Sequence, residues 1–120
     1  MESTNKIGID LGGTNLRAGI IRNGNPIEVV QEGLYHGGNK DEILQQIIAL
    51  IQNLGIENAQ GIGIGVPSVV DTERGIVYHV THIPSWDEVH LKEILEDTFH
   101  IPVHVNNDVN CFILGEIGRA

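Results

Sequence analysis

The first 22 residues contain the feature that most constrains the fold of this chain. Two apolar alternating runs, Lys6 to Leu11 and Asn15 to Arg22, flank a Gly12-Gly13-Thr14 turn. This pattern predicts a β-hairpin rather than a strand followed directly by a helix. Glycines let the backbone of the turn approach an anion closely, and successive amides in such a turn can form an anion-binding concavity. Two interpretations follow, an ordinary tight turn and a phosphate-binding turn.

Asp10 stands two residues before Gly12, just ahead of this turn, and bears on the choice between the two interpretations. A carboxylate repels a bare phosphate, whereas a divalent cation between the two groups removes the repulsion. If the turn binds phosphate, we therefore expect a magnesium nucleotide as the ligand. The chain has no G-x-x-x-x-G-K-[ST] loop, and the spacing of Gly61, Gly63 and Gly65 is wrong for a dinucleotide fingerprint.

Composition narrows the class of protein. A chain of 120 residues supports one domain with a core. The net charge of −9 and the pI near 4.9 argue against nucleic acid or an anionic membrane as a partner. One cysteine rules out an intrachain disulfide, and no apolar run has the length of a membrane span. We expect a cytoplasmic protein with no nucleic-acid and no membrane partner.

Apolar periodicity and turn residues divide the chain into strands and helices. After the hairpin we expect a strand over 27–34, a helix over 39–54, a strand over 60–66, a short strand over 76–78, a helix over 85–99, a strand over 102–106 and a final helix after 107–108. Both longer helices begin at sequences typical of a capping box. The order predicts an α/β domain with a mixed five-stranded sheet, strand order 3-2-1-4-5, and helices on both faces.

Three groups of polar or turn residues follow the parallel strands of this predicted sheet. They are Asp10, Pro67-Ser68 and Asn107-Asp108. Because open α/β sheets bind ligands at the carboxyl ends of their strands, we expect these residues to meet in one cleft. Asp108 is also a favoured N-cap for the helix that follows, so its local pattern fits a structural role as well as a catalytic one.

Other residues allow fewer conclusions. The six histidines show no spacing typical of a zinc site, so we do not predict a metal site from them. Trp86 is expected to be a packing anchor beside a helix start. Arg17 either points away from the buried side of its strand or reaches back over the glycine turn, and the sequence leaves both options open.

Four segments, in chain order, resemble a known family. Gly8 to Asn15 (GIDLGGTN) is similar to the first phosphate motif of the actin-like ATPase superfamily, which includes sugar kinases. Asn107 to Cys111, followed by Leu114-Gly115-Glu116, resembles the N-D-A-N-C-x-x-x-G-E segment of the ROK family (repressor, open reading frame, kinase). Gly63 to Pro67 and Ile83 to Trp86 match that family's central segments. The resemblance covers nearly the whole chain and implies a ribonuclease H-like (actin-like ATPase) fold.

The resemblance implies ATP-dependent phosphorylation of a hexose or N-acyl-hexosamine, usually at the 6-hydroxyl, with ATP and Mg²⁺. Asp108 matches the family's catalytic base and also contacts the sugar, and Asn107 matches a sugar ligand. Asp10 matches the carboxylate associated with the metal of Mg-ATP, and Gly12-Gly13-Thr14 match the phosphate turn. Phosphoryl transfer needs such positioned groups, a metal that neutralises phosphate charge and a carboxylate that orients the attacking hydroxyl.

The chain departs from the family pattern in two respects. Pro67 and Ser68, expected to bind the sugar, stand where the family usually has Pro-Gly. The adenosine-binding half and the family's zinc motif are absent, so residues 1–120 correspond to an N-terminal lobe, with structural zinc expected only in the C-terminal lobe. The resemblance implies a homo-oligomer for the full-length protein. The alternatives are a sugar-responsive transcriptional regulator of the same family and a non-catalytic sugar-binding module.

Overall fold

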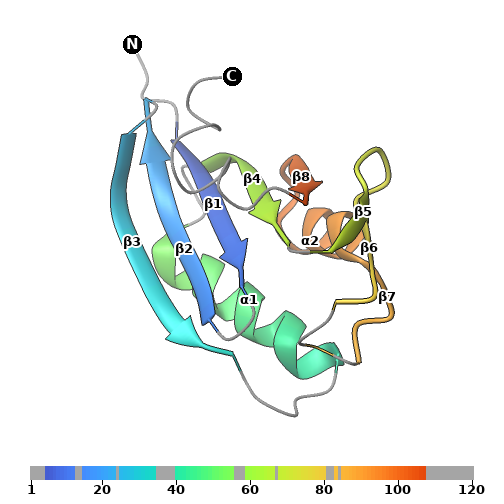
Figure 1. The fold of residues 1–120 in the computed structure, drawn as a ribbon. Helices are drawn as coiled ribbons and strands as arrows, with labels where there is room; N and C mark the ends of the chain where they lie inside the picture. The colour runs from blue at the N-terminus through green and yellow to red at the C-terminus, as the bar shows by residue number, and fades with distance from the viewer. Residues whose placement is uncertain are drawn as a thin grey trace.

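The computed structural model of the chain describes residues 5–12, 15–23, 25–34, 40–55, 59–66, 68–80, 83 and 85–107. These residues form a five-stranded sheet, a three-stranded sheet and two helices (Figure 1). In chain order the elements are β1 (Asn5–Leu11), β2 (Asn15–Arg22), β3 (Asn25–Gly33), α1 (Lys40–Leu54), β4 (Ala59–Gly65), β5 (Val69–Asp71), β6 (Ile76–Tyr78), β7 (Glu88–His90), α2 (Leu91–Phe99) and β8 (Val103–Asn106).

The large sheet has the strand order β3-β2-β1-β4-β8. Strands β1, β2 and β3 pair antiparallel as successive hairpins, and β4 and β8 extend the sheet parallel to β1. The predicted order 3-2-1-4-5 is therefore confirmed, with β8 as its fifth strand. The parallel arrangement places the carboxyl ends of β1, β4 and β8 side by side, as the sequence predicted.

One face of this sheet forms the core of the domain. Alternate residues of the three parallel strands share that face and are almost fully buried: Ile7, Ile9, Leu11, Ile62, Ile64, Val103 and Val105. Apolar residues of both helices belong to the same core cluster, so α1 and α2 cover the same face. The further helix expected after Asp108 lies outside the described residues.

Helix α1 is fixed at its carboxyl end and near its middle. It ends as predicted at a glycine, Gly55, whose φ of 90° few other residues tolerate. Near its middle the buried Gln46 donates from Nε2 to Glu32 Oε1 (2.8 Å) and to the carbonyl of Gly33 (2.8 Å). These bonds join α1 to the end of β3, the outermost strand.

The segment before α2 differs from the sequence-based expectation. The pattern over 85–88 predicts a helix start, but α2 begins at Leu91, and Glu88–His90 form strand β7 beside β6. The helix has no side-chain cap at its start. Trp86 is fully buried and its Nε1 donates to the carbonyl of Lys40 (3.4 Å), so it is the expected packing anchor, but in a turn rather than a helix.

In the described part of the chain, neither helix has the length and apolar character needed to cross a membrane.

Candidate functional site

The strand ends bring three residues of the large sheet into one row. Asp10 of β1 is in register with Gly65 of β4, and Gly65 is in register with Asn106 of β8. Two strand spacings separate Asp10 from Asn106, which places their Cα atoms about 10 Å apart. Gly65 stands between them without a side chain and is buried in this structure.

The same row continues across the antiparallel half of the sheet. Arg17 of β2 lies opposite Asp10, and Gln31 of β3 lies opposite Arg17. Since successive residues of a strand point to opposite faces, this row lies on the sheet face opposite the one that the helices cover. We call these five residues the polar row: Gln31, Arg17, Asp10, Gly65 and Asn106.

Asp10 is the most unusual residue of the polar row. Its side chain is 14% exposed, and its Oδ2 lies 3.9 Å from Nη1 of Arg17. Its Oδ1 is buried and has no hydrogen-bond partner among the described residues. Burial raises the pKa of Asp10 above its usual value, and the positive charge of Arg17 opposes that shift. Arg17 therefore lies on the face away from the core, with its guanidinium beside Asp10.

The buried Oδ1 of Asp10 fits a cation ligand, because a buried acceptor without a donor is costly unless a further group satisfies it. Among the described residues no three His, Cys, Asp or Glu side chains gather as a metal site. Mg²⁺ in nucleotide sites is often held by one or two carboxylates together with phosphates. Asp10 therefore suits a cation held mainly by a nucleotide, rather than a metal site made by protein alone.

The glycine turn after β1 is closely packed. The amide of Gly12 donates to the carbonyl of Asn15 (2.9 Å), and a Cβ added at Gly12 would lie 3.2 Å from that oxygen. The Gly12 amide is thus engaged in closing the hairpin. Gly13 and Thr14, which the sequence assigns to phosphate binding, lie outside the described residues.

Ser68, a predicted sugar ligand, bonds to backbone on both sides. Its amide donates to the carbonyl of Val66 (2.9 Å), and its hydroxyl donates to the carbonyl of Tyr78. These bonds join the end of β4 to the small sheet β5-β6-β7. The proton of the Ser68 hydroxyl is therefore engaged in a hydrogen bond within the fold. Pro67 lies outside the described residues.

The end of β8 carries the remaining predicted residues. Asn107 is exposed, and its amide donates to Asn106 Oδ1 (2.7 Å). The amide of Val66 donates to the carbonyl of Asn106 (2.9 Å), which ties the ends of β4 and β8 together. Asp108, the predicted catalytic base, lies outside the described residues. The sequence reasoning missed Gly65 and Asn106 as members of this site, although strand alternation with the predicted strand order contains that signal.

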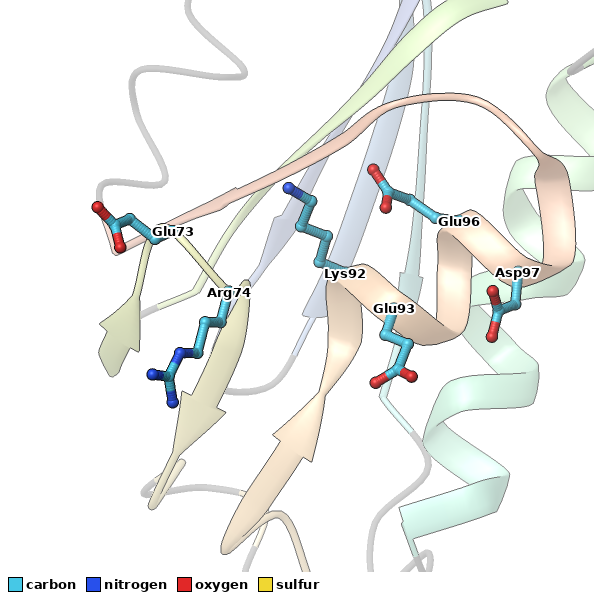
Figure 2. Close-up of a pocket in the computed structure, with 6 residues that line it drawn as sticks. All are labelled: Glu73, Arg74, Lys92, Glu93, Glu96 and Asp97. Atoms are coloured by element: carbon cyan, nitrogen blue, oxygen red, sulfur yellow. The ribbon is translucent and has the colours of Figure 1, made fainter.

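A separate cavity of about 270 Å³ lies between the β5–β6 turn and α2 (Figure 2). Its walls combine four carboxylates with two cations: Glu73, Arg74, Lys92, Glu93, Glu96 and Asp97. None of these residues belongs to the polar row. The cavity is therefore a different place from the strand ends where the chemistry is expected.

A mixed five-stranded sheet in this order, with a glycine turn in its first hairpin and a carboxylate at the end of β1, defines an actin-like ATPase domain. Comparison with protein families identifies the family within this class. The model of the ROK family matches residues 6–118, and the chain belongs to that family.

Known proteins agree with this assignment. A glucokinase of Thermotoga maritima is 34% identical over 112 residues, covering 92% of this chain and 35% of the relative. A xylose repressor of Caldicellulosiruptor bescii is 33% identical over 119 residues, covering 92% of this chain and 29% of the relative. The solved ROK-family glucokinase of Streptomyces griseus, in complex with glucose and AMPPNP, superimposes with a TM-score of 0.77 at 28% identity, covering 89% of this chain and 34% of that one. The chain spans about a third of the length of these relatives.

Proposed function

We propose that the protein containing this chain transfers the γ-phosphoryl group of ATP to a sugar hydroxyl, and that residues 1–120 are the N-terminal lobe of that kinase. The observation that carries the proposal is the polar row at the ends of the parallel strands, where Asp10 presents a buried oxygen without a partner in the described residues. The similarity to a glucokinase over 92% of the chain supports the same reaction.

Each candidate residue has a role in this reaction. Asp10 holds the cation of Mg-ATP, and the Gly12-Gly13-Thr14 turn lies against the phosphates. Bound Mg²⁺ neutralises phosphate charge during transfer. Asp108 accepts the proton of the attacking hydroxyl, and Asn107 orients the sugar. Support for these two roles comes from the sheet order, in which β8, the strand that Asn107 follows, is the second strand from β1.

The substrate in this proposal is a hexose or N-acyl-hexosamine that is phosphorylated at its 6-hydroxyl. The glucokinase relative and the solved structure with glucose favour glucose within that class. Ser68 differs from the family's usual glycine, and its hydroxyl is bound to the Tyr78 carbonyl. Its influence on the choice of sugar is therefore through the shape of the loop after β4.

The test uses the full-length protein with ATP, Mg²⁺ and a panel of glucose, mannose, N-acetylglucosamine and N-acetylmannosamine. ADP release by a coupled assay, with NMR of the product, identifies the sugar and the phosphorylated hydroxyl. In the same assay Asp108→Asn is expected to lower kcat by at least about 100-fold, because a general base contributes about 10²–10⁴-fold. Asn is as good an N-cap as Asp, so the stability of this variant is expected to fall by less than about 1 kcal/mol.

The outcomes separate catalysis from structure. An unchanged kcat at saturating sugar would refute Asp108 as the base, and a large loss of stability would show that its main role is in the fold. Phosphorylation of none of these sugars by a folded protein would refute the kinase proposal.

A second candidate function, a sugar-responsive regulator, is favoured by the similarity to a xylose repressor. The net charge of −9 in this chain speaks against contact of this lobe with DNA. Sugar-dependent binding of DNA by the full-length protein, without phosphorylation, would establish the regulator instead.

A further inference from the structure

We propose that Arg17 is a positioning residue of the site, which holds Asp10 through its Oδ2 oxygen and so leaves Oδ1 for the cation of the bound nucleotide. This inference rests on the proposed function and assigns a role to a residue outside the phosphate turn. It predicts that Arg17 acts only through Asp10, without contact of its own with the phosphates.

The register of the hairpin supports this role. Arg17 and Asp10 are directly opposite each other on β1 and β2, with Nη1 3.9 Å from Oδ2. Side chains of directly opposed residues lie close enough to interact across the two strands. Because the pairing is set by the sheet, the position of Arg17 does not depend on a flexible loop.

The two oxygens of Asp10 have different surroundings. Oδ2 lies near Arg17, whereas Oδ1 is buried and has no partner in the described part of the chain. A carboxylate with one oxygen near a cation and the other buried is restricted in its rotation about χ2. A residue that restricts a metal-binding carboxylate in this way acts on metal affinity without touching the metal.

The side chain of Arg17 is more exposed than that of Asp10. The side chain of Arg17 is 39% exposed, against 14% for Asp10. A guanidinium that is partly in water can keep its charge while it reaches over the sheet to the carboxylate. The next residue of the row, Gln31, is exposed on the outermost strand and carries no charge, so Asp10 is the one acid within the polar row.

The experiment compares Arg17→Met, which removes the charge but keeps the chain length, with Arg17→Lys, which keeps the charge. Arg22→Met is the matched control, because Arg22 lies on the same strand and donates to Asn5 Oδ1 (3.0 Å), away from the polar row. The full-length protein is mixed with AMPPNP and Mn²⁺, and bound Mn²⁺ is measured by electron paramagnetic resonance. Steady-state kinetics and thermal unfolding are measured on the same preparations.

We expect Arg17→Met to weaken Mn²⁺ retention and to lower kcat, each by about 10- to 100-fold, with the KM for sugar unchanged. Arg17→Lys is expected to restore most of both, and Arg22→Met to behave as the parent protein. Asp10→Asn is expected to remove Mn²⁺ retention, and the double variant Asp10→Asn with Arg17→Met to be no worse than Asp10→Asn alone.

The outcomes distinguish this inference from the proposed function. Additive losses in the double variant would show that Arg17 contacts the phosphates directly and would overturn the positioning role. Normal Mn²⁺ retention in folded Arg17→Met would overturn it as well. Mn²⁺ retention by the parent protein without phosphorylation of any sugar would refute the kinase proposal alone, while the Arg17 comparison would still stand.

Discussion

Asp10 is a carboxylate whose surroundings oppose its charge. It stands near the end of β1 between the fully buried Ile9 and Leu11, and one of its oxygens has no partner among the described residues. The nearby guanidinium of Arg17 compensates only in part, since the pKa of Asp10 stays above its usual value. Groups that are kept in such unfavourable surroundings are typical of binding and catalytic sites.

The raised pKa leads to a prediction about stability. A carboxyl that titrates higher in the folded than in the unfolded state favours folding when protonated, so its ionised form destabilises the fold once the pH exceeds the folded pKa. Asp10→Asn is therefore expected to unfold at a higher temperature than the parent at pH 7, by about 1–3 °C in a domain of this size. The gain is expected to shrink as the pH falls, and to vanish below the unfolded pKa, near 3.8.

Thermal unfolding followed by circular dichroism between pH 3.5 and pH 8, roughly the range over which carboxyl groups titrate, measures this difference. Asp97→Asn removes an exposed carboxylate from α2 and controls for the change of net charge alone. A parent protein that is more stable than Asp10→Asn at pH 7 would contradict the prediction and would show that the ion pair with Arg17 outweighs desolvation.

At the scale of elements, the small sheet is fixed to α2 through one glycine. Gly75 has a φ of +66°, and a Cβ added to it would lie 2.1 Å from the Cβ of Lys92. Its carbonyl accepts a hydrogen bond from the amide of Lys92 (3.2 Å), in the first turn of a helix that has no side-chain cap. The β5–β6 turn therefore supplies the start of α2 with an acceptor that the sequence around His90 does not provide.

Gly75→Ala is expected to lower the free energy of unfolding by about 1–3 kcal/mol from the backbone conformation alone, with a further loss from the clash with Lys92. Gly33→Ala is the matched control, because an added Cβ there meets no atom within 4 Å; it is expected to stay within about 0.5 kcal/mol of the parent. Urea unfolding of the three proteins tests the pair. Equal stability of the two variants would mean that the turn moves freely away from α2.

Elements that depend on local sequence signals were predicted well, whereas elements that depend on contacts distant in the sequence were not. The hairpins over 5–33 and helix α1 were predicted close to their bounds, because alternation, glycine turns and apolar periodicity are local signals. Strand β7 was missed because three residues, Glu88–His90, carry little periodicity and become a strand only by pairing with β6. The capping pattern at 85–88 was overridden by this pairing and by the burial of Trp86.

The sequence likewise predicted part of the candidate site. The meeting of the strand ends followed from the strand order, and the position of Arg17 beside Asp10 follows from the register of the hairpin. The unequal surroundings of the two Asp10 oxygens did not follow, because burial depends on everything that packs over the row. The hydrogen bond from Ser68 to Tyr78 likewise depends on the small sheet, of which the sequence predicted only the strand over 76–78.

At the scale of the whole molecule, the polar row lies on one face of one sheet. Phosphoryl transfer requires that the donor and acceptor be held in line and that water be excluded, which a single open wall does not achieve. The chain spans about a third of the length of the relatives it matches, and in our proposal the rest of the protein forms the opposite wall. In the same proposal, the glycine turn and Asp10 contact only phosphate and metal, and the rest of the protein binds adenosine.

Residues 1–120 alone are therefore expected to show no measurable phosphorylation of glucose and to bind ATP far more weakly than the full-length protein. Calorimetry with Mg-ATP on both proteins, beside the coupled assay, measures this. The two-dimensional NMR spectrum of the isolated chain checks that the sheet has formed, so that weak binding reflects the missing wall and not a failure to fold. Micromolar affinity of a folded isolated chain would mean that the nucleotide site is complete in this lobe, and the assignment of adenosine binding to the remainder of the protein would be wrong.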